Sequence, residues 1–256
     1  MYEQTAHTVH GNKSTGMPPA VAGGLSCILI VLLFVTTHSR NALYLDKLTL
    51  WGDTLRKSPQ SQRSIYNYGY ALFTLGKDDD AITALSTLEH KPPGKIRRDH
   101  LYLQLGTSYF RMGKYENAVL AWHKGLEYAP HDAIFLNNLA MAYLRMDKFS
   151  SAKEYIAQAL IADPLLKEAA STKGEILLAQ KEYGQAAVWF LRSIERDPED
   201  MSGYWFAAQA YAKAKRYGDA RRYAEMALKK DGDEQFRNNI LKFVESIDGR
   251  AGTVSK

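Results

Sequence analysis

The sequence has 256 residues, enough for one main domain and a smaller appendage, and a formal net charge of +5. Basic residues alternate with acidic ones throughout, and no RGG tract or aromatic-basic sheet motif occurs, so we expect a solvated surface and no nucleic-acid partner. The single cysteine, Cys27, excludes an intramolecular disulfide and a cysteine-rich zinc site.

The N-terminal part divides into a polar stretch and an apolar one. Residues 1–19 show no periodicity and predict a disordered tail. Residues 20–37 carry no charge, and eighteen helical residues span about 27 Å, close to the ~30 Å hydrocarbon core of a bilayer. We therefore predict a transmembrane helix over residues 20–40. A cleaved signal peptide is the competing interpretation, but the start is neither short nor basic and no A-x-A site follows the apolar run.

The anchor also bears on oligomeric state and orientation. Ala20 and Gly24 form a small-x-x-x-small pair, so a homodimer through the anchor is one expectation, and ordinary glycine in a membrane helix is the simpler one. Upstream, the flank offers one basic residue, Lys13. The downstream flank offers Arg40, Lys47, Arg56 and Lys57. By the positive-inside rule, this count favours a cytoplasmic location for the rest of the chain.

The remainder of the chain carries three series of residues with a constant spacing. The first is Gly69, Gly106, Ala140, Gly174 and Ala208, the second is Ala81, Ala118, Ala152, Ala186 and Ala220, and the third is Pro59, Pro93, Pro130, Pro164 and Pro198. Each series steps by 34 residues except across one segment, where it steps by 37. Three additional residues therefore lie between Pro93 and Gly106, in a basic loop. The series predict five repeats, over residues 62–95, 99–132, 133–166, 167–200 and 201–234.

Residues 99–132 contain the most complete repeat. Tyr102, Leu105, Gly106 and Tyr109 fall on one helical stripe, and Ala118, Trp122 and Gly125 fall on a second. Gly113 permits a sharp turn between the two helices, and Pro130 ends the second. This order and spacing resemble the tetratricopeptide repeat, a helix–turn–helix unit of about 34 residues. The resemblance implies an all-α fold, a right-handed superhelix (α-solenoid) of five repeats.

Additional helical segments are predicted to cap both ends of the repeat array. Residues 41–61 read as a leading half repeat, with Trp51 in the aromatic place of a second repeat helix. Apolar residues at helical spacing predict a capping helix over residues 234–247, which completes a repeat domain at residues 62–247. Residues 248–256 are predicted to be a frayed tail.

The junction before the first repeat has a narrower resemblance. Leu50, Trp51, Asp53, Ser58, Pro59, Asn67 and Gly69 follow in the order seen after the last span of repeat-containing membrane glycosyltransferases of the protein O-mannosyltransferase type, and of related bacterial membrane proteins. Those proteins carry many catalytic spans before this point, whereas one span is predicted here. The resemblance implies a periplasmic or lumenal location for the repeats, against the charge count, and does not imply catalysis. We thus expect a single-pass protein of a bacterial inner membrane with periplasmic repeats.

No motif that carries chemistry occurs. The sequence lacks HExxH, G-x-S-x-G, Walker and GxGxxG strings, and its seven histidines show no ligand spacing. Asp78, Asp79 and Asp80 open a predicted helix, where negative charge is favourable without a metal. We predict no enzyme activity, no cofactor and no metal.

The predicted function lies in the concave groove that the first helices of a solenoid line. When the repeats are aligned with one another, ten residues are predicted to face this groove: Tyr66, Tyr70, Phe73, Phe110, Arg111, Asn137, Met141, Arg145, Trp205 and Lys213. Packing of Tyr66, Phe73 and Phe110 between adjacent repeats is the alternative. The Lys/Asn carboxylate clamp of chaperone-binding members is absent, because Tyr66, Tyr70 and Thr107 occupy its places.

These features predict a membrane-anchored scaffold or adaptor that binds a protein segment in the groove, for assembly of a membrane or envelope complex. Aromatic contacts would supply most of the affinity, and Arg111, Arg145 and Lys213 would select an acidic partner. Two alternatives stay open: an accessory, non-catalytic subunit of a membrane glycosyltransferase or envelope-polymer system, and a fragment of a larger multi-span protein.

Overall fold

The structure is a computed structural model of the whole chain, and it describes residues 46–92, 94, 96–230 and 233–254. Over these residues the chain forms twelve α-helices and no strand. They are α2 (Lys47–Lys57), α3 (Gln62–Thr74), α4 (Asp78–Ser86), α5 (Arg98–Arg111), α6 (Tyr115–Tyr128), α7 (Ala133–Arg145), α8 (Phe149–Ala162), α9 (Lys167–Ala179), α10 (Tyr183–Arg196), α11 (Met201–Lys213), α12 (Tyr217–Leu228) and α13 (Glu234–Val254). The all-α prediction is confirmed.

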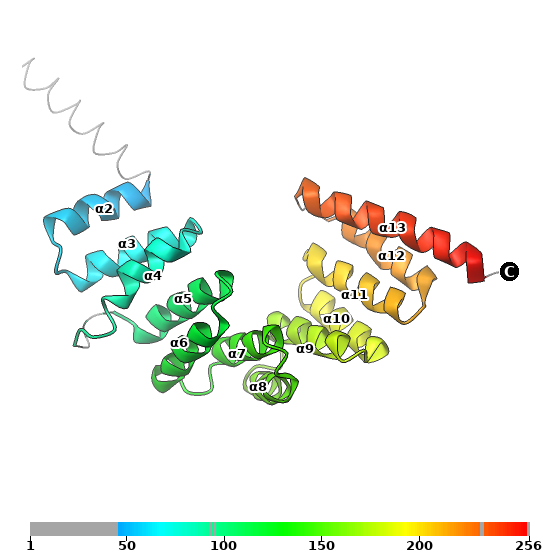
Figure 1. Cartoon of the computed structure of the whole chain (residues 1–256), viewed down its shortest axis with the longest axis horizontal. Helices are drawn as coiled ribbons and strands as arrows, with labels where there is room; N and C mark the ends of the chain where they lie inside the picture. Colours follow the sequence, from blue (N-terminus) through cyan, green and yellow to red (C-terminus); the bar gives the residue numbers. More distant parts are fainter. Residues whose placement is uncertain (1–45, 93, 95, 231–232, 255–256) are drawn as a thin grey trace, which may run out of the picture.

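The helices pair into five hairpins that stack into an open arc (Figure 1). These are α3/α4, α5/α6, α7/α8, α9/α10 and α11/α12, with α2 before them and α13 after them. First helices also contact one another across neighbouring repeats: α3 meets α5, α7 meets α9, and α9 meets α11. The first helices therefore lie along the inner side of the arc, where a groove is expected.

The small residues of the sequence series sit where the two helices of a repeat cross. A Cβ atom on Gly106 would lie 2.3 Å from Trp122 Nε1, and one on Gly174 would lie 2.6 Å from Phe190 Cε1. On Gly69 it would lie 2.6 Å from Leu85 Cγ. The five alanines of the second series are all fully buried. A side chain at these glycines would displace the largest core residue of its repeat, so the spacing has a steric cause.

The turn between the helices of each repeat requires a left-handed residue. Gly76, Gly113, Asp147, Lys181 and Lys215 occupy this position, with φ between 55° and 73°. The first two repeats use glycine, which adopts this conformation without strain. The last three place an L-residue there, at a cost of about 1–2 kcal/mol.

The ends of the array are capped, but not as predicted in detail. Helix α2 begins at Lys47, after Asp46, whose carboxylate accepts hydrogen bonds from the Leu48 and Thr49 amides. Helix α13 buries Ile240 and Ile247 against the last repeat and continues to Val254. The expectation of a frayed tail from residue 248 is therefore wrong up to residue 254.

None of the helices in the described part of the chain combines the length and the apolar character needed to cross a bilayer. The predicted tail at residues 1–19 and the predicted span at residues 20–40 lie outside the described residues. The anchor stays a prediction.

The steric requirement for glycine at the helix crossing can be tested by substitution. We expect Gly106→Ala to lower the free energy of unfolding by about 1–3 kcal/mol relative to Gly184→Ala, because the new methyl group overlaps the Trp122 indole. Gly184 is helical too, but a Cβ there meets nothing within 4 Å. Urea unfolding followed by circular dichroism measures the difference. Equal stability of the two variants would contradict the steric explanation.

Strain in the turns can also be tested. Lys181 has a φ of 64°, so Lys181→Gly should raise the free energy of unfolding by about 1 kcal/mol through relief of that strain. As the matched control, Lys242→Gly removes an exposed lysine from the interior of α13 and should lower the stability by about 1 kcal/mol. Thermal and urea unfolding report both changes, and a destabilised Lys181→Gly variant would refute the strain.

Candidate functional site

Three aromatic side chains form a continuous row on α3, at the N-terminal end of the arc. Tyr66 and Tyr70 stack at a centroid distance of 6.4 Å with nearly parallel rings, and Tyr70 and Phe73 stack at 6.2 Å. Their spacing of four and three residues places them on one helix face. Tyr70 is 43% exposed. We call Tyr66, Tyr70 and Phe73 the aromatic row.

The first residue of the row is tied to the next repeat. The Tyr66 hydroxyl accepts a hydrogen bond of 2.8 Å from Gln104 Nε2 of α5. Partial burial raises the pKa of Tyr66, so the phenol stays protonated and can donate its own hydrogen. Tyr66 therefore contacts the next repeat and is also part of the inner surface.

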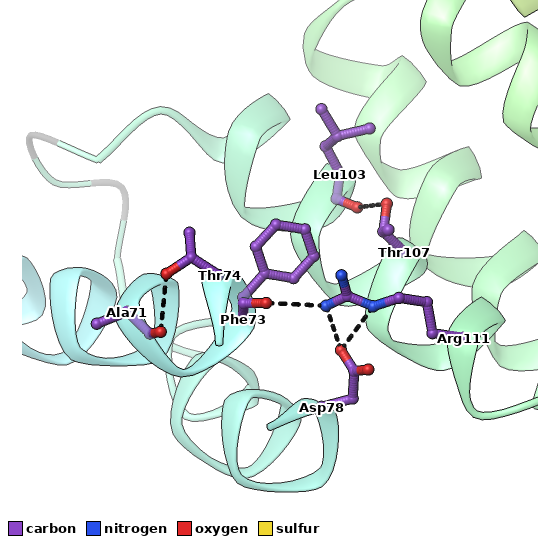
Figure 2. A network of polar contacts seen from close by, with 7 residues as sticks. All are labelled: Ala71, Phe73, Thr74, Asp78, Leu103, Thr107 and Arg111. Carbon is purple, nitrogen blue, oxygen red and sulfur yellow. Dashed lines mark hydrogen bonds and ion pairs between the residues drawn. The ribbon is translucent and has the colours of Figure 1, made fainter. Parts of the chain in front are cut away.

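Arg111 closes the other end of the row (Figure 2). Its guanidinium carbon lies 4.3 Å from the Phe73 ring centroid, and its Nη2 donates to the Phe73 carbonyl at 3.0 Å. Its Nε donates to Asp78 Oδ1 at 3.0 Å, which makes an ion pair between repeats one and two. Nearby, Thr74 and Thr107 donate their hydroxyl hydrogens to carbonyls of their own helices, Ala71 and Leu103. Arg111 thus already has partners within the chain.

Two predicted groove aromatics lie in the packing between helices. Phe110 lies 5.9 Å from the Trp122 ring and 5.3 Å from Tyr115, within the core of repeats two and three. Trp205 makes edge contacts with Phe236 and Phe243 of the capping helix α13. Both side chains are only partly buried, and their main contacts are structural.

The middle of the inner surface holds a polar cavity of about 360 Å³. Asn137 and Met141 line it from α7, and Thr172 and Glu175 line it from α9. Asn137 is 3% exposed and Thr172 is fully buried, yet Asn137 Oδ1 and Thr172 Oγ1 have no hydrogen-bond partner in the described structure. Arg145 makes a 3.0 Å ion pair with Glu175, so it too is neutralised within the chain.

Lys213 lies at the C-terminal end of the inner surface. With Trp205 and Phe243 it lines a cavity of about 300 Å³ between α11 and α13. The lysine is exposed, and no ion pair involves it in the part of the chain that the structure describes. The ten predicted residues therefore do not form one cluster: they are spread along the arc on four first helices, α3, α5, α7 and α11.

The sequence analysis missed one feature, a cavity of about 530 Å³ beside the aromatic row. We call it the basic pocket and define it by Arg63, Tyr66, Asn67, Ile96, Arg97 and His100. Arg63 and Tyr66 come from α3, whereas Ile96, Arg97 and His100 come from the segment around the start of α5. The three-residue insertion was the signal that could have located it.

Within the described residues, no group of three or more histidine, cysteine, aspartate or glutamate side chains could hold a metal ion. The predictions of no metal and no catalysis remain predictions.

Comparison with known proteins agrees with this architecture. The family model "Tetratricopeptide repeat" matches residues 103–145, 137–200 and 190–234. The TPR repeat-containing protein YpiA of Bacillus subtilis is 28% identical over 165 residues, which cover 64% of this chain and 38% of YpiA. The chain spans less than half the length of the curated relatives it matches.

Two solved structures share the fold. TTC0263 of Thermus thermophilus, a thermophilic TPR protein, has a TM-score of 0.61 at 14% identity, covering 73% of this chain and 98% of its own. The APC/C hetero-tetramer Cut9–Hcn1 has a TM-score of 0.64 at 17% identity, covering 79% of this chain and 40% of the other. At these identities the similarity concerns the fold alone. Since the family matches together extend from residue 103 to residue 234, the chain belongs to the tetratricopeptide repeat family.

Proposed function

We propose that this chain is a non-catalytic scaffold that binds a segment of a partner protein along the inner surface of its repeats and holds it near a membrane. The observation that carries the proposal is the aromatic row, in which stacked rings on one helix face leave Tyr70 exposed. An exposed tyrosine of this kind offers apolar area and a hydroxyl at low entropic cost, which is typical of binding hot spots.

The polar cavity near Asn137 also supports binding along the inner surface. Its lining also includes Asn138, Ser171 and Glu175, polar side chains that are partly exposed and can form hydrogen bonds with a bound chain. Arg111 and Arg145 are engaged with Asp78 and Glu175, however. Selection of an acidic partner by these two arginines would require exchange of an existing ion pair, which in such exposed pairs costs about 0–1 kcal/mol.

The membrane part of the proposal rests on the sequence. The uncharged residues 20–37 are long enough for a helix of about 27 Å, and only residues 38–46 separate them from α2. An anchor there would hold the N-terminal end of the arc, and with it the aromatic row, close to the bilayer. The periplasmic side, a homodimer through the anchor and a role in assembling an envelope complex belong to this proposal.

The alternative role beside a membrane glycosyltransferase rests on the junction from Leu50 to Gly69. Several of its residues have structural functions here. Asp53 makes ion pairs with Arg56 and Lys57 on α2, and Gly69 makes room for Leu85. Ion pairs within α2 and the crossing of α3 with α4 account for these two residues, so the scaffold is the better supported function.

Binding can be tested with peptides that the full-length chain selects from a phage-displayed random library. For a selected peptide, we expect Tyr70→Ala to weaken the affinity by about tenfold or more, as for a truncated hot spot. Fluorescence anisotropy of the labelled peptide measures it. The matched control is Tyr128→Ala, which removes another exposed tyrosine from the second helix of repeat two. If neither variant alters binding, the aromatic row is not the site, and if no peptide is enriched, the proposed function is wrong.

The anchor can be tested in membranes. We expect the full-length chain to stay in the membrane fraction after a carbonate wash, because residues 20–40 cross the bilayer, and a variant lacking residues 20–40 to be released. Protease added to sealed inside-out vesicles should leave periplasmic repeats intact and should digest cytoplasmic ones. Release of the full-length chain by salt alone would refute the anchor.

A further inference from the structure

The three-residue insertion between repeats one and two builds a pocket that a regular repeat junction does not need. The buried Arg98, 8% exposed, holds the insertion in place: its guanidinium donates hydrogen bonds to the carbonyls of Leu88 and Lys91. Gln62 Nε2 of α3 donates to the Pro92 carbonyl at 3.1 Å. These contacts hold the segment after α4 against the start of α3.

This arrangement forms the basic pocket beside the aromatic row. Its volume is about 530 Å³, and Tyr66 lines it on one side while stacking on Tyr70 on the other. A single extended segment can therefore fill the pocket and contact the aromatic row at once. The amide of Asn67 and the side chain of Ile96 complete a wall that is part polar and part apolar.

The charge at the pocket is positive. Arg63 and Arg97 line it, and none of the described acidic residues does. Arg63 is exposed and takes part in no ion pair within the described residues, in contrast to Arg111 and Arg145. The central cavity near Asn137 is lined by more acidic than basic residues, since Glu168, Glu175 and Asp200 lie there together with Lys167. The basic pocket thus has cationic charge that the chain itself does not neutralise.

One of the cations at the pocket already has a partner within the chain. Arg97 makes a two-point contact with the Asp99 carboxylate, with Nε donating to Oδ1 at 3.3 Å and Nη2 donating to Oδ2. This hydrogen bonding lowers the pKa of Asp99, so the carboxylate stays ionised. A carboxylate is therefore already held at the rim, while Arg63 and His100 face the pocket without one.

We propose that the basic pocket binds an acidic side chain of the partner segment, with an aromatic or aliphatic neighbour of that residue packed on Tyr66 and Tyr70. This inference rests on the proposed function, since it names the chemistry of the segment that the inner surface takes. It assigns the acidic preference mainly to Arg63, which makes no ion pair within the described residues, and to Arg97 through exchange of its pair with Asp99, in place of Arg111 and Arg145.

The test uses the full-length chain in detergent and a phage-displayed library of random peptides. We expect the unmodified chain to enrich peptides with aspartate or glutamate next to an aromatic or aliphatic residue. An Arg63→Gln/Arg97→Gln variant should still enrich the apolar residue but lose the acidic one. For one selected peptide, the double variant should bind about tenfold more weakly, as expected for loss of charge-assisted hydrogen bonds. A peptide with glutamine in place of its acidic residue should bind both proteins equally.

The matched control is Lys114→Gln/Lys229→Gln, which removes two exposed positive charges away from the pocket and should leave the selection unchanged. Circular dichroism and urea unfolding check that the variants fold equally well. Peptides without acidic residues, or acidic peptides bound equally by the Arg63/Arg97 variant, would overturn the pocket and leave the groove proposal standing. If the library yields no peptide with any of these proteins, both proposals are wrong.

Discussion

The two helices of each repeat cross so closely that the first helix carries only glycine or a buried alanine at the crossing. At Gly106 a single added carbon would lie 2.3 Å from the Trp122 indole, and Gly174 and Gly69 meet Phe190 and Leu85 in the same way. This contact sets the angle between the helices, because the large residue can fill the core only if the opposing backbone approaches it directly. Repetition of the crossing at a constant spacing makes the arc, and the arc makes the inner surface.

The largest side chains pack in the core at the helix crossings, and the aromatic residues of the inner face differ in what they contact. Phe110 and Trp205 contact Trp122 and the capping helix, so their contribution is mainly to stability. In repeat one the equivalent core place, on α4, is taken by Leu85, and the row of Tyr66, Tyr70 and Phe73 on α3 leaves Tyr70 exposed. The candidate binding surface is thus strongest in the first repeat, next to the predicted anchor.

The charged residues also differ between the first repeat and the rest of the arc. Neighbouring repeats are linked by ion pairs such as Arg111–Asp78 and Arg145–Glu175. Each pair neutralises a cation of the inner face and contributes little to stability by itself, since these side chains are partly in solvent. Beside the insertion this neutralisation is incomplete: Arg97 pairs with Asp99, but Arg63 makes no ion pair within the described residues. A departure from the period therefore creates the one distinctive chemical feature that we find on the described inner face.

The sequence by itself determined the helical hairpins, their number and the place of the insertion, because glycine, alanine and proline act through local sterics that recur with the period. It also located the turns, although it did not show that Asp147, Lys181 and Lys215 adopt the left-handed conformation that Gly113 adopts. Only the tertiary structure decided that Arg111 is paired with Asp78, that Trp205 lies against α13, and that Arg63, Tyr66 and Arg97 enclose a pocket. Those contacts join residues about one repeat apart. They depend on the superhelical angle between repeats, which many side chains set together and which no local pattern encodes.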